Sequence, residues 1–375
     1  MLIPSRTPLL ILIDLMIILF IYAILRKKYW QRSDVSTSDT NLAMGLIFIF
    51  CMFSFWGTDW FHYQEDFWTI RNYPDFVSNL EPVYEFLIRH VFPEYLSFRF
   101  TIWGTALLFV YLSIKHLKLD LALSCLFFGL LFMYNFAYGR VSLPVSMMVY
   151  GAIIIDRPFD GKEKLSVVLG LLLIGTSVFF HKSAIFGIAI VIFSFLPIQL
   201  NRNYWFYTIF AFAAIALAAK FMLADIISNA MSSDNASLQQ SLNSGMSYMS
   251  REQRESSFRL VLQSLLERAP YYVAALVSYL LLVEYELPRG IRIIARLDLF
   301  LVIFSSVFAL NLGVNTSEIY LRLIQFVFVP STIVLVYAFT YDLYPKLTRF
   351  AFIEGTLCVL YFIIYAFYDS VLNNR

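Results

Sequence analysis

The chain has 375 residues, of which 60% are hydrophobic and 14% are charged, and its formal net charge is +2. A soluble domain of this length needs far less apolar sequence, so the composition is typical of a polytopic membrane protein. The near-neutral charge does not bear on nucleic-acid binding, but no basic run with a nucleic-acid motif occurs, so no nucleic-acid partner is expected. The lipid bilayer is the partner that the composition indicates.

Apolar runs in chain order predict the membrane spans. A helix that crosses a bilayer needs roughly 20 apolar residues, and about 17 suffice. We therefore predict an all-α integral membrane protein with one domain, residues 1–375, and about 12 transmembrane helices. The runs lie at residues 9–25, 42–56, 100–114, 121–138, 141–155, 166–180, 183–197, 204–223, 269–283, 297–312, 323–341 and 350–368. Because the first run has its basic residues after it, unlike a secretory signal peptide, we expect it to be retained.

Lys and Arg concentrate in alternate connections between these runs, which is typical of loops on the cytoplasmic side. The basic connections are residues 26–32, 115–118, 156–164, 201–203, 289–296 and 345–349. We therefore expect both chain ends on the outer face of the membrane. Two long loops, residues 57–99 and 224–268, are expected on the same outer face.

The three cysteines, Cys51, Cys125 and Cys358, all fall inside apolar runs. Their separation fits neither a disulfide framework nor a zinc motif, so we expect them to be core residues. Neither a DxD nor an HExxH motif is found on the expected outer face. The sequence therefore predicts a site without a metal ion or another cofactor.

Five runs that enter the membrane from the expected outer face begin beside cationic residues. Both the helix dipole and the topology rule disfavour cations at these helix starts. A bound anion would resolve the conflict, because amide groups at a helix start and a guanidinium converge on phosphate oxygens. The alternative is that nearby acids neutralise each cation locally. The cationic residues are Arg99, Arg140, His181 with Lys182, Arg268 and Arg322.

Arg140 and Arg322 are the strongest members of this predicted anion site. Arg140 is followed by Val-Ser-Leu-Pro, and Pro144 is tolerated only in the first turn of a helix, which fixes the helix start near the arginine. Arg322 follows Tyr320 closely. His181 is expected on the same face as Arg140, either as a hydrogen-bonded structural histidine or as a contact for a phosphate or leaving group.

The two long outer loops supply further candidate residues. The first contains Asp59, His62, Glu81 and Tyr84, which offer a base and ring-stacking faces for a sugar, although acids and aromatics are also common in solvated loops and at the membrane interface. Residues 228–257 of the second loop are polar and form either a cover over a site or a simple connection. A helix that begins near Ser250 would offer Arg254 and Arg259 to one side.

Together these residues resemble the EpsG-like branch of the Wzy-type bacterial polysaccharide polymerases. The matching segments follow one another in the family's order at residues 59–63, 81–84, 140–148, 180–184 and 320–328. One departure is the Arg-Val-Ser-Leu-Pro sequence from Arg140, where the family more often has Arg-Gln-Gly-Leu-Ala. A second is the number of acids in the first loop, which leaves the base open among Asp59, Glu65, Asp66 and Glu81.

The resemblance implies a GT-C-like architecture and a polymerase that moves a glycan from undecaprenyl diphosphate to a lipid-linked repeat unit, with inversion. It implies that Arg140 and Arg322 bind the diphosphate, that His181 assists its departure, and that Asp59 or Glu81 is the base. A chain-length regulator is a candidate partner. Whether the product is O-antigen, capsule or exopolysaccharide stays open. Further substrate contacts are expected from His62, Tyr84, Lys182, Arg254, Arg259 and Tyr320.

The alternatives are a transporter or flippase for lipid-linked oligosaccharide, an O-antigen ligase and a membrane acyltransferase. Transporters usually place ionisable residues at mid-membrane and show internal repeats. In this chain the apolar runs are nearly free of charge, with Asp14 and Lys220 as the main exceptions. A ligase would share the cationic cluster and differ in its acceptor.

Overall fold

The computed structural model describes residues 8–53, 58–73, 75–76, 80–196, 205–231, 258–309 and 323–373. Within these ranges the protein is built from helices, and no strand is found. The expected all-α class is therefore confirmed for the part of the chain that the structure describes.

The helices occur where the apolar runs predict them, and each expected span coincides with one helix or with consecutive helices. Two of them, α5 and α9, are long and apolar enough to cross a membrane by length and composition. The shorter apolar helices are compatible with a membrane protein, whereas the number of crossings stays a prediction. The helices are α1 (Pro8–Trp30), α2 (Thr37–Phe53), α3 (Thr58–Asn72), α4 (Pro82–His90), α5 (Tyr95–His116), α6 (Leu121–Phe127), η1 (Phe128–Phe132), α7 (Met133–Tyr138), α8 (Ser142–Asp156), α9 (Glu163–Phe180), α10 (Ala184–Phe195), α11 (Trp205–Met231), α13 (Phe258–Glu284), α14 (Ile291–Ala309), η2 (Ile324–Val327), α16 (Phe328–Thr340) and α17 (Pro345–Asn373).

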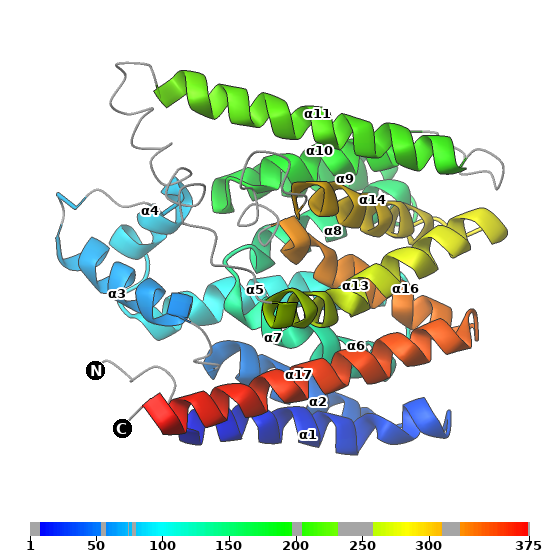
Figure 1. Cartoon of the computed structure of the whole chain (residues 1–375), viewed down its shortest axis with the longest axis horizontal. Helices are drawn as coiled ribbons and strands as arrows, with labels where there is room; N and C mark the ends of the chain where they lie inside the picture. Colours follow the sequence, from blue (N-terminus) through cyan, green and yellow to red (C-terminus); the bar gives the residue numbers. More distant parts are fainter. Residues whose placement is uncertain are drawn as a thin grey trace.

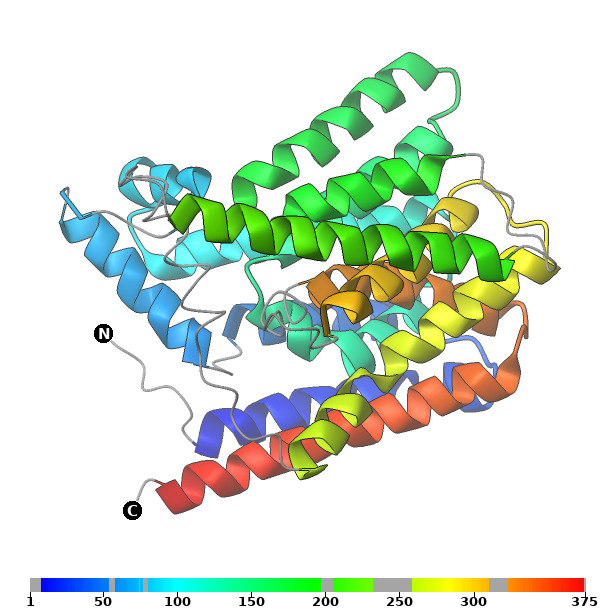
Figure 2. The ribbon, with the colours of Figure 1, turned by 45° about the horizontal axis from the view of Figure 1, so that its top comes forward.

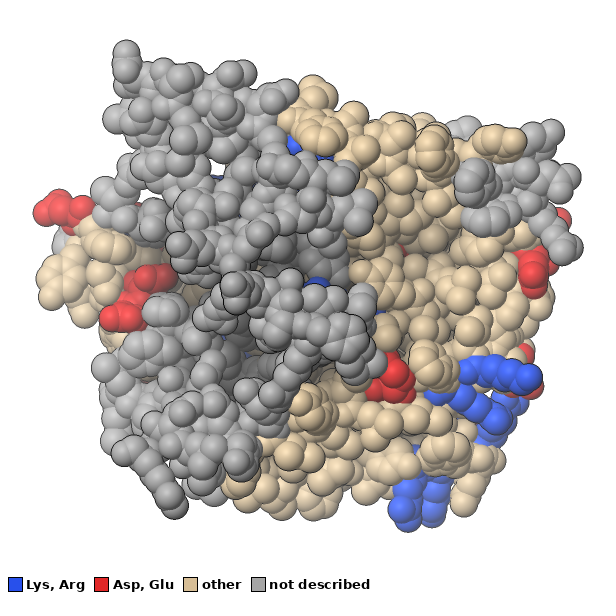
Figure 3. Space-filling view, in the orientation of Figure 1, with Lys and Arg blue, Asp and Glu red and all other residues tan. Residues whose placement is uncertain are grey.

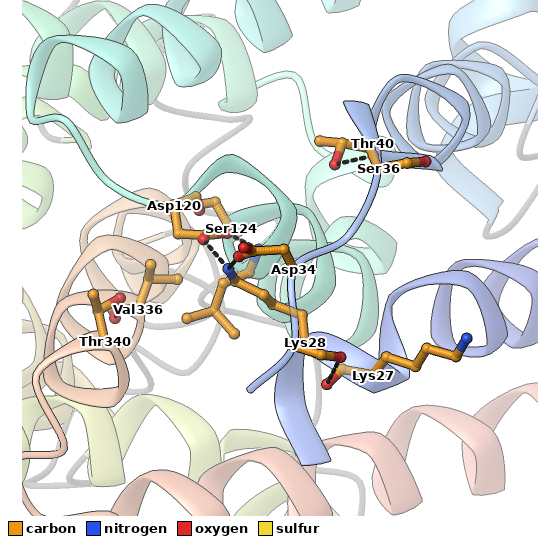
Figure 4. Close-up of polar contacts among 11 residues, drawn as sticks. Lys27, Lys28, Asp34, Ser36, Thr40, Asp120, Ser124, Val336 and Thr340 are labelled. Atoms are coloured by element: carbon orange, nitrogen blue, oxygen red, sulfur yellow. Dashed lines mark hydrogen bonds and ion pairs between the residues drawn. The ribbon is translucent and has the colours of Figure 1, made fainter. Parts of the chain in front are cut away.

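The basic connections meet at one end of the helix bundle, which we call the basic end. Lys28, at the end of α1, lies 2.8 Å from the carboxylate of Asp120 at the start of α6 and 3.4 Å from that of Asp34 (Figure 4). Arg32 forms an ion pair with Asp342, which lies between α16 and α17. The connections that follow α1, α5 and α16 are therefore neighbours in space.

Two further contacts add the remaining described connections to the basic end. The ring nitrogen Nε2 of His116 lies 2.6 Å from the carbonyl oxygen of Arg157. The backbone N–H of Gly290 donates to the carboxylate of Asp156 at 2.6 Å. The sequence correctly predicts that these loops share one side, and residues 201–203 lie outside the described part. Which side faces the cytoplasm stays a prediction.

The opposite end of the bundle carries α3 and α4, and we call it the Arg140 end (Figure 1). The start of α1 and the end of α17 lie at this end as well, since both helices have their other terminus at the basic end. The expected first loop, residues 57–99, contains α3, α4 and the start of α5. In Figure 3 most of the visible Lys and Arg lie over the basic end, beside the end of α1 and the start of α17, and Asp and Glu are seen over α3 and α4.

The centre of the bundle is formed by α8 and α16, whose side chains are buried almost all round. Both views show α1 beside α17 on one flank (Figures 1 and 2), and Figure 1 shows α11 on the opposite flank. On α8, Gly151 faces Gly170 of α9 so closely that a Cβ at Gly151 would lie 2.8 Å from the Gly170 carbonyl oxygen. Small residues that let two backbones approach in this way are typical of helix pairs in membranes.

Candidate functional site

Arg140 lies in the short turn between α7 and α8. The turn is fixed by Ser142, whose hydroxyl donates to the carbonyl oxygens of Phe136 and Gly139. Helix α8 begins at Ser142, so Pro144 falls in its first turn, where the missing N–H costs no helical hydrogen bond. The predicted helix start beside Arg140 is confirmed.

Three segments of the chain, α8, the first turn of α10 and η2, meet beside this turn. A Cβ added at Gly139 would lie 2.9 Å from Oε1 of Gln325, in η2. A Cβ at Gly187, in the first turn of α10, would meet the end of the Met148 side chain on α8 and lie 3.0 Å from the ring of Phe326. The segments that follow Arg140, His181 and residue 322 therefore converge, as the anion-site hypothesis requires of these three.

The guanidinium of Arg140 is held between a ring and a carboxylate. Its Cζ lies 4.7 Å from the ring centroid of Tyr63 on α3, and Nη1 lies 3.4 Å from Oε2 of Glu81. Burial alone would lower the pKa of Arg140, but Tyr63 and Glu81 raise it above its ordinary value, so the side chain stays charged. Among the described residues, its buried Nε has no hydrogen-bond partner. A guanidinium in this state retains donor capacity for a further acceptor.

Glu81 directs its carboxylate at Arg140 instead of at its own helix. It occupies the N-cap position of α4, before Pro82, but its side chain makes no capping hydrogen bond. The shorter side chains of Asp, Asn, Ser and Thr usually cap a helix from this position, whereas the longer Glu81 side chain extends to Arg140. With only 7% of its side chain exposed, Glu81 has Arg140 as its ion-pair partner in the described part of the chain.

Tyr84 holds the backbone of the Arg140 turn through a hydrogen bond. It is 1% exposed, and its hydroxyl donates to the carbonyl oxygen of Arg140 at 3.1 Å. Burial and the neighbouring Glu81 raise the pKa of Tyr84, so the phenol remains a donor. Its ring packs edge-on against Phe180, the residue before His181, with centroids 5.8 Å apart. Tyr84 thus connects the Arg140 turn to the end of α9, and its expected contact with substrate stays a prediction.

Helices α3 and α4 form a hairpin that two arginines lock. Arg71 of α3 donates to the carbonyl oxygens of Ile88 and Phe92 at the end of α4, at 2.9 and 2.8 Å. Arg89 of α4 donates in return to the carbonyl oxygen of Ile70 near the end of α3, at 3.1 Å. Each arginine therefore satisfies carbonyl groups that a helix end leaves free. This hairpin presents one residue from each helix, the Tyr63 ring and the Glu81 carboxylate, to Arg140.

His181 terminates α9 and is 5% exposed. Its Nδ1 accepts the backbone N–H of Ser183 at 3.2 Å and lies 2.6 Å from the Ser183 hydroxyl. Because a backbone N–H can only donate, Nδ1 carries no proton, and the neutral ring has its proton on Nε2. This tautomer suits a histidine that donates to a leaving oxygen, whereas the Ser183 contacts equally suit the structural alternative. Lys182, the next residue, is exposed.

Two of these cationic residues, Arg99 and Arg268, do not stand at helix starts, which corrects the sequence-based expectation. Arg99 lies inside α5, is 1% exposed, and donates to the carbonyl oxygens of Cys51 at 2.9 Å and Ala137 at 3.2 Å. These carbonyls belong to the ends of α2 and α7, where the helix dipole favours a cation. Arg268 lies within α13, ten residues after it begins at Phe258. Neither residue therefore shows the conflict with the dipole that predicted an anion site.

Several predicted site residues cannot be placed by their side chains. Asp59 and His62 belong to α3, and Arg259 belongs to α13, but their side chains lie outside the described part. The positions of Tyr320, Arg322 and Arg254 lie outside it as well. Among the described site residues, the structure brings together Glu81, Tyr84 and Arg140. Tyr84 also contacts Phe180, the last residue of α9, which directly precedes His181.

The sequence did not single out Tyr63, Gln325 or Asp298. Tyr63 belongs to the segment at residues 59–63, but only its stacking on Arg140 shows a role. Asp298 lies in α14, fully buried, and accepts hydrogen bonds from Ser278 of α13 at 2.7 Å and Ser331 of α16 at 2.6 Å. A lone acid inside an apolar run is the signal that could have found it.

No three His, Cys, Asp or Glu residues of the described ranges are grouped to hold a metal ion. A model of the EpsG family matches residues 40–374, nearly the whole chain. No curated protein and no solved structure matches it.

Proposed function

The chain belongs to the EpsG family, and from this premise we propose that it is a polysaccharide repeat-unit polymerase of the Wzy type. Its donor is a glycan on undecaprenyl diphosphate, and its acceptor is a lipid-linked repeat unit at the outer face of the bacterial cytoplasmic membrane. The Arg140 end of a GT-C-like helix bundle would face the periplasm, and transfer would invert the sugar without a metal ion.

The observation that carries this proposal is the largely buried Arg140 guanidinium, which stays charged at the start of α8. Free amides at helix starts and a guanidinium both bind phosphate oxygens. A diphosphate leaving group carries negative charge that grows as the sugar bond breaks, and a fixed cation stabilises that charge more than water does. The site therefore suits the donor's diphosphate better than it suits an uncharged sugar.

In the proposed reaction an acceptor hydroxyl attacks the anomeric carbon from the face opposite the diphosphate. The new bond to the hydroxyl oxygen forms while the bond to the diphosphate oxygen breaks, and the electron pair leaves with the diphosphate. Arg140, with Arg322 as a proposed second cation, holds this anion. A carboxylate, Glu81 or Asp59, takes the hydroxyl proton, and the Nε2 proton of His181 is donated to the leaving oxygen.

The test is Arg140→Ala in cells that carry this gene as their only copy. We expect normal membrane insertion, lipid carrier with a single repeat, and a loss of long chains of at least about 100-fold, since removal of one such donor costs 10²–10³ in rate. Arg157→Ala at the basic end is the matched control and should leave the chain-length ladder unchanged.

Other outcomes separate the alternatives. A normal ladder in Arg140→Ala would remove the support for the polymerase proposal. Long chains that stay on the lipid carrier would identify a ligase instead. Single repeats that remain on the cytoplasmic leaflet would identify a flippase.

A further inference from the structure

The anion position beside Arg140 is already filled by one of the protein's own carboxylates. Glu81 is buried, is directed away from the amides of its own helix, and lies 3.4 Å from Nη1 of Arg140. A diphosphate that approached the same guanidinium would meet a buried negative charge. Two anions close together in a partly desolvated site repel each other, so both cannot keep the same position on Arg140.

The Glu81–Arg140 contact is also the weaker of two ion pairs made by α4. Glu85, one turn later, accepts from Nε of Arg89 at 2.9 Å, and Arg89 is held further by backbone carbonyl oxygens. The Glu81 contact is single and 0.5 Å longer (3.4 against 2.9 Å). The hairpin thus contains one pair that is locked in place and one that a stronger acceptor can open.

Resting on the proposed function, we infer that Glu81 is an internal anion that the donor's diphosphate displaces from Arg140, and that the displaced carboxylate is the base. Before the donor binds, the carboxylate is engaged on the guanidinium and is not free to meet an acceptor hydroxyl. After displacement, Glu81 takes the proton of the acceptor hydroxyl as that oxygen bonds to the anomeric carbon. The diphosphate departs with the electron pair of the broken bond and remains on Arg140.

This arrangement imposes an order on the reaction. The base becomes available only when a donor occupies the site, so an acceptor or a water molecule alone is not activated. It also predicts that Glu81 affects anion binding and polymer formation in opposite directions, which neither a simple base nor a purely structural residue would do. Replacing a residue that acts only as a base would leave anion affinity unchanged. Replacing a residue that only positions Arg140 would lower both anion affinity and polymer synthesis.

The test uses the full chain in detergent with inorganic pyrophosphate as the probe, measured by calorimetry, beside polymer synthesis in cells. We expect Glu81→Gln to bind pyrophosphate about tenfold more tightly, a typical coupling between two sites, because the competing charge is gone. Polymer synthesis should fall by about 100-fold or more because the base is lost. Glu85→Gln, on the same helix and in an ion pair of its own, is the matched control and should change neither property.

Unchanged or weaker pyrophosphate binding by Glu81→Gln would overturn the displacement, and full polymer synthesis would overturn the role as base. Glu81→Asp is a second test of the displacement if Glu81→Gln does not fold. Its shorter side chain withdraws from Arg140 but keeps a carboxylate, so affinity should rise about threefold with most synthesis retained. If the unaltered chain and Arg140→Ala bind pyrophosphate equally, the failure lies in the proposed function and not in the exchange of anions.

Discussion

The two ends of the bundle use their cations differently. At the basic end Lys28 pairs with two carboxylates, and its contact to Asp120 is short, at 2.8 Å. At the Arg140 end the guanidinium has one carboxylate at 3.4 Å and a buried Nε without a partner among the described residues. A partly exposed pair of the first kind joins loops and contributes little energy. At the Arg140 end the carboxylate of the pair is only 7% exposed, and an incompletely satisfied cation in such a pair is costly to keep, which indicates that a ligand completes it.

Burial alone does not identify a ligand-binding cation, as a comparison of Arg99 with Arg140 shows. Arg99 is more deeply buried than Arg140, yet its donors reach the carbonyl ends of α2 and α7 and its guanidinium stacks on Trp103 at 4.7 Å. Arg99 therefore joins helices. The features that mark Arg140 are its position at a helix start and its unfilled hydrogen-bonding capacity.

The largest effects should come from exchanging these two arginines for alanine. Arg99→Ala leaves two buried carbonyl groups without their donor and should lower the free energy of unfolding by about 3 kcal/mol. Arg140→Ala should change stability far less and abolish polymer formation. Thermal unfolding in detergent, measured beside the chain-length ladder, separates the two effects. If both variants lost stability equally, the difference between the two arginines would disappear.

A smaller effect is expected from Asp298, which joins three helices in the middle of the bundle. Asp298→Ala would leave the hydroxyls of Ser278 and Ser331 without their acceptor and should cost about 2 kcal/mol of unfolding free energy. Asp298→Asn keeps an acceptor for one serine and a donor toward the other, so it should cost less than about 1 kcal/mol. Unfolding temperatures of the two variants check this order, and equal losses would show that the charge matters more than the hydrogen bonds.

Much of the fold could be predicted from the sequence because apolar runs and loop charges are local signals. The runs locate the helices, and the alternation of Lys and Arg correctly assigns the described loops to the two ends. The start of α8 is predictable because Pro144 is tolerated only in the first turn of a helix. The apolar run that predicts α5 begins at residue 100, which would place Arg99 at a helix start. The helix begins at Tyr95 instead, so Arg99 lies inside it.

The candidate site was only partly predictable, because it depends on long-range contacts. Arg140, Glu81 and Tyr84 were identified by their positions, but no local pattern shows that Tyr84 supports the Arg140 backbone or that Glu81 faces the guanidinium. The sequence predicts an acidic loop where α3 and α4 form a hairpin held by Arg71 and Arg89. Arginines that cap a neighbouring helix produce no periodic pattern in the sequence, so the hairpin could not be predicted.

The smallest effect should come from the basic end. Lys28→Ala removes a partly exposed ion pair with Asp120, which stabilises by less than about 1 kcal/mol because both charges remain hydrated. The unfolding temperature in low salt should fall slightly, the difference should vanish in high salt because surface charges are screened, and the chain-length ladder should be normal. A loss of long chains in a variant that is inserted and stable would mean that the basic end takes part in transfer. The contrast between an end that holds loops together and an end that binds a ligand would then have to be abandoned.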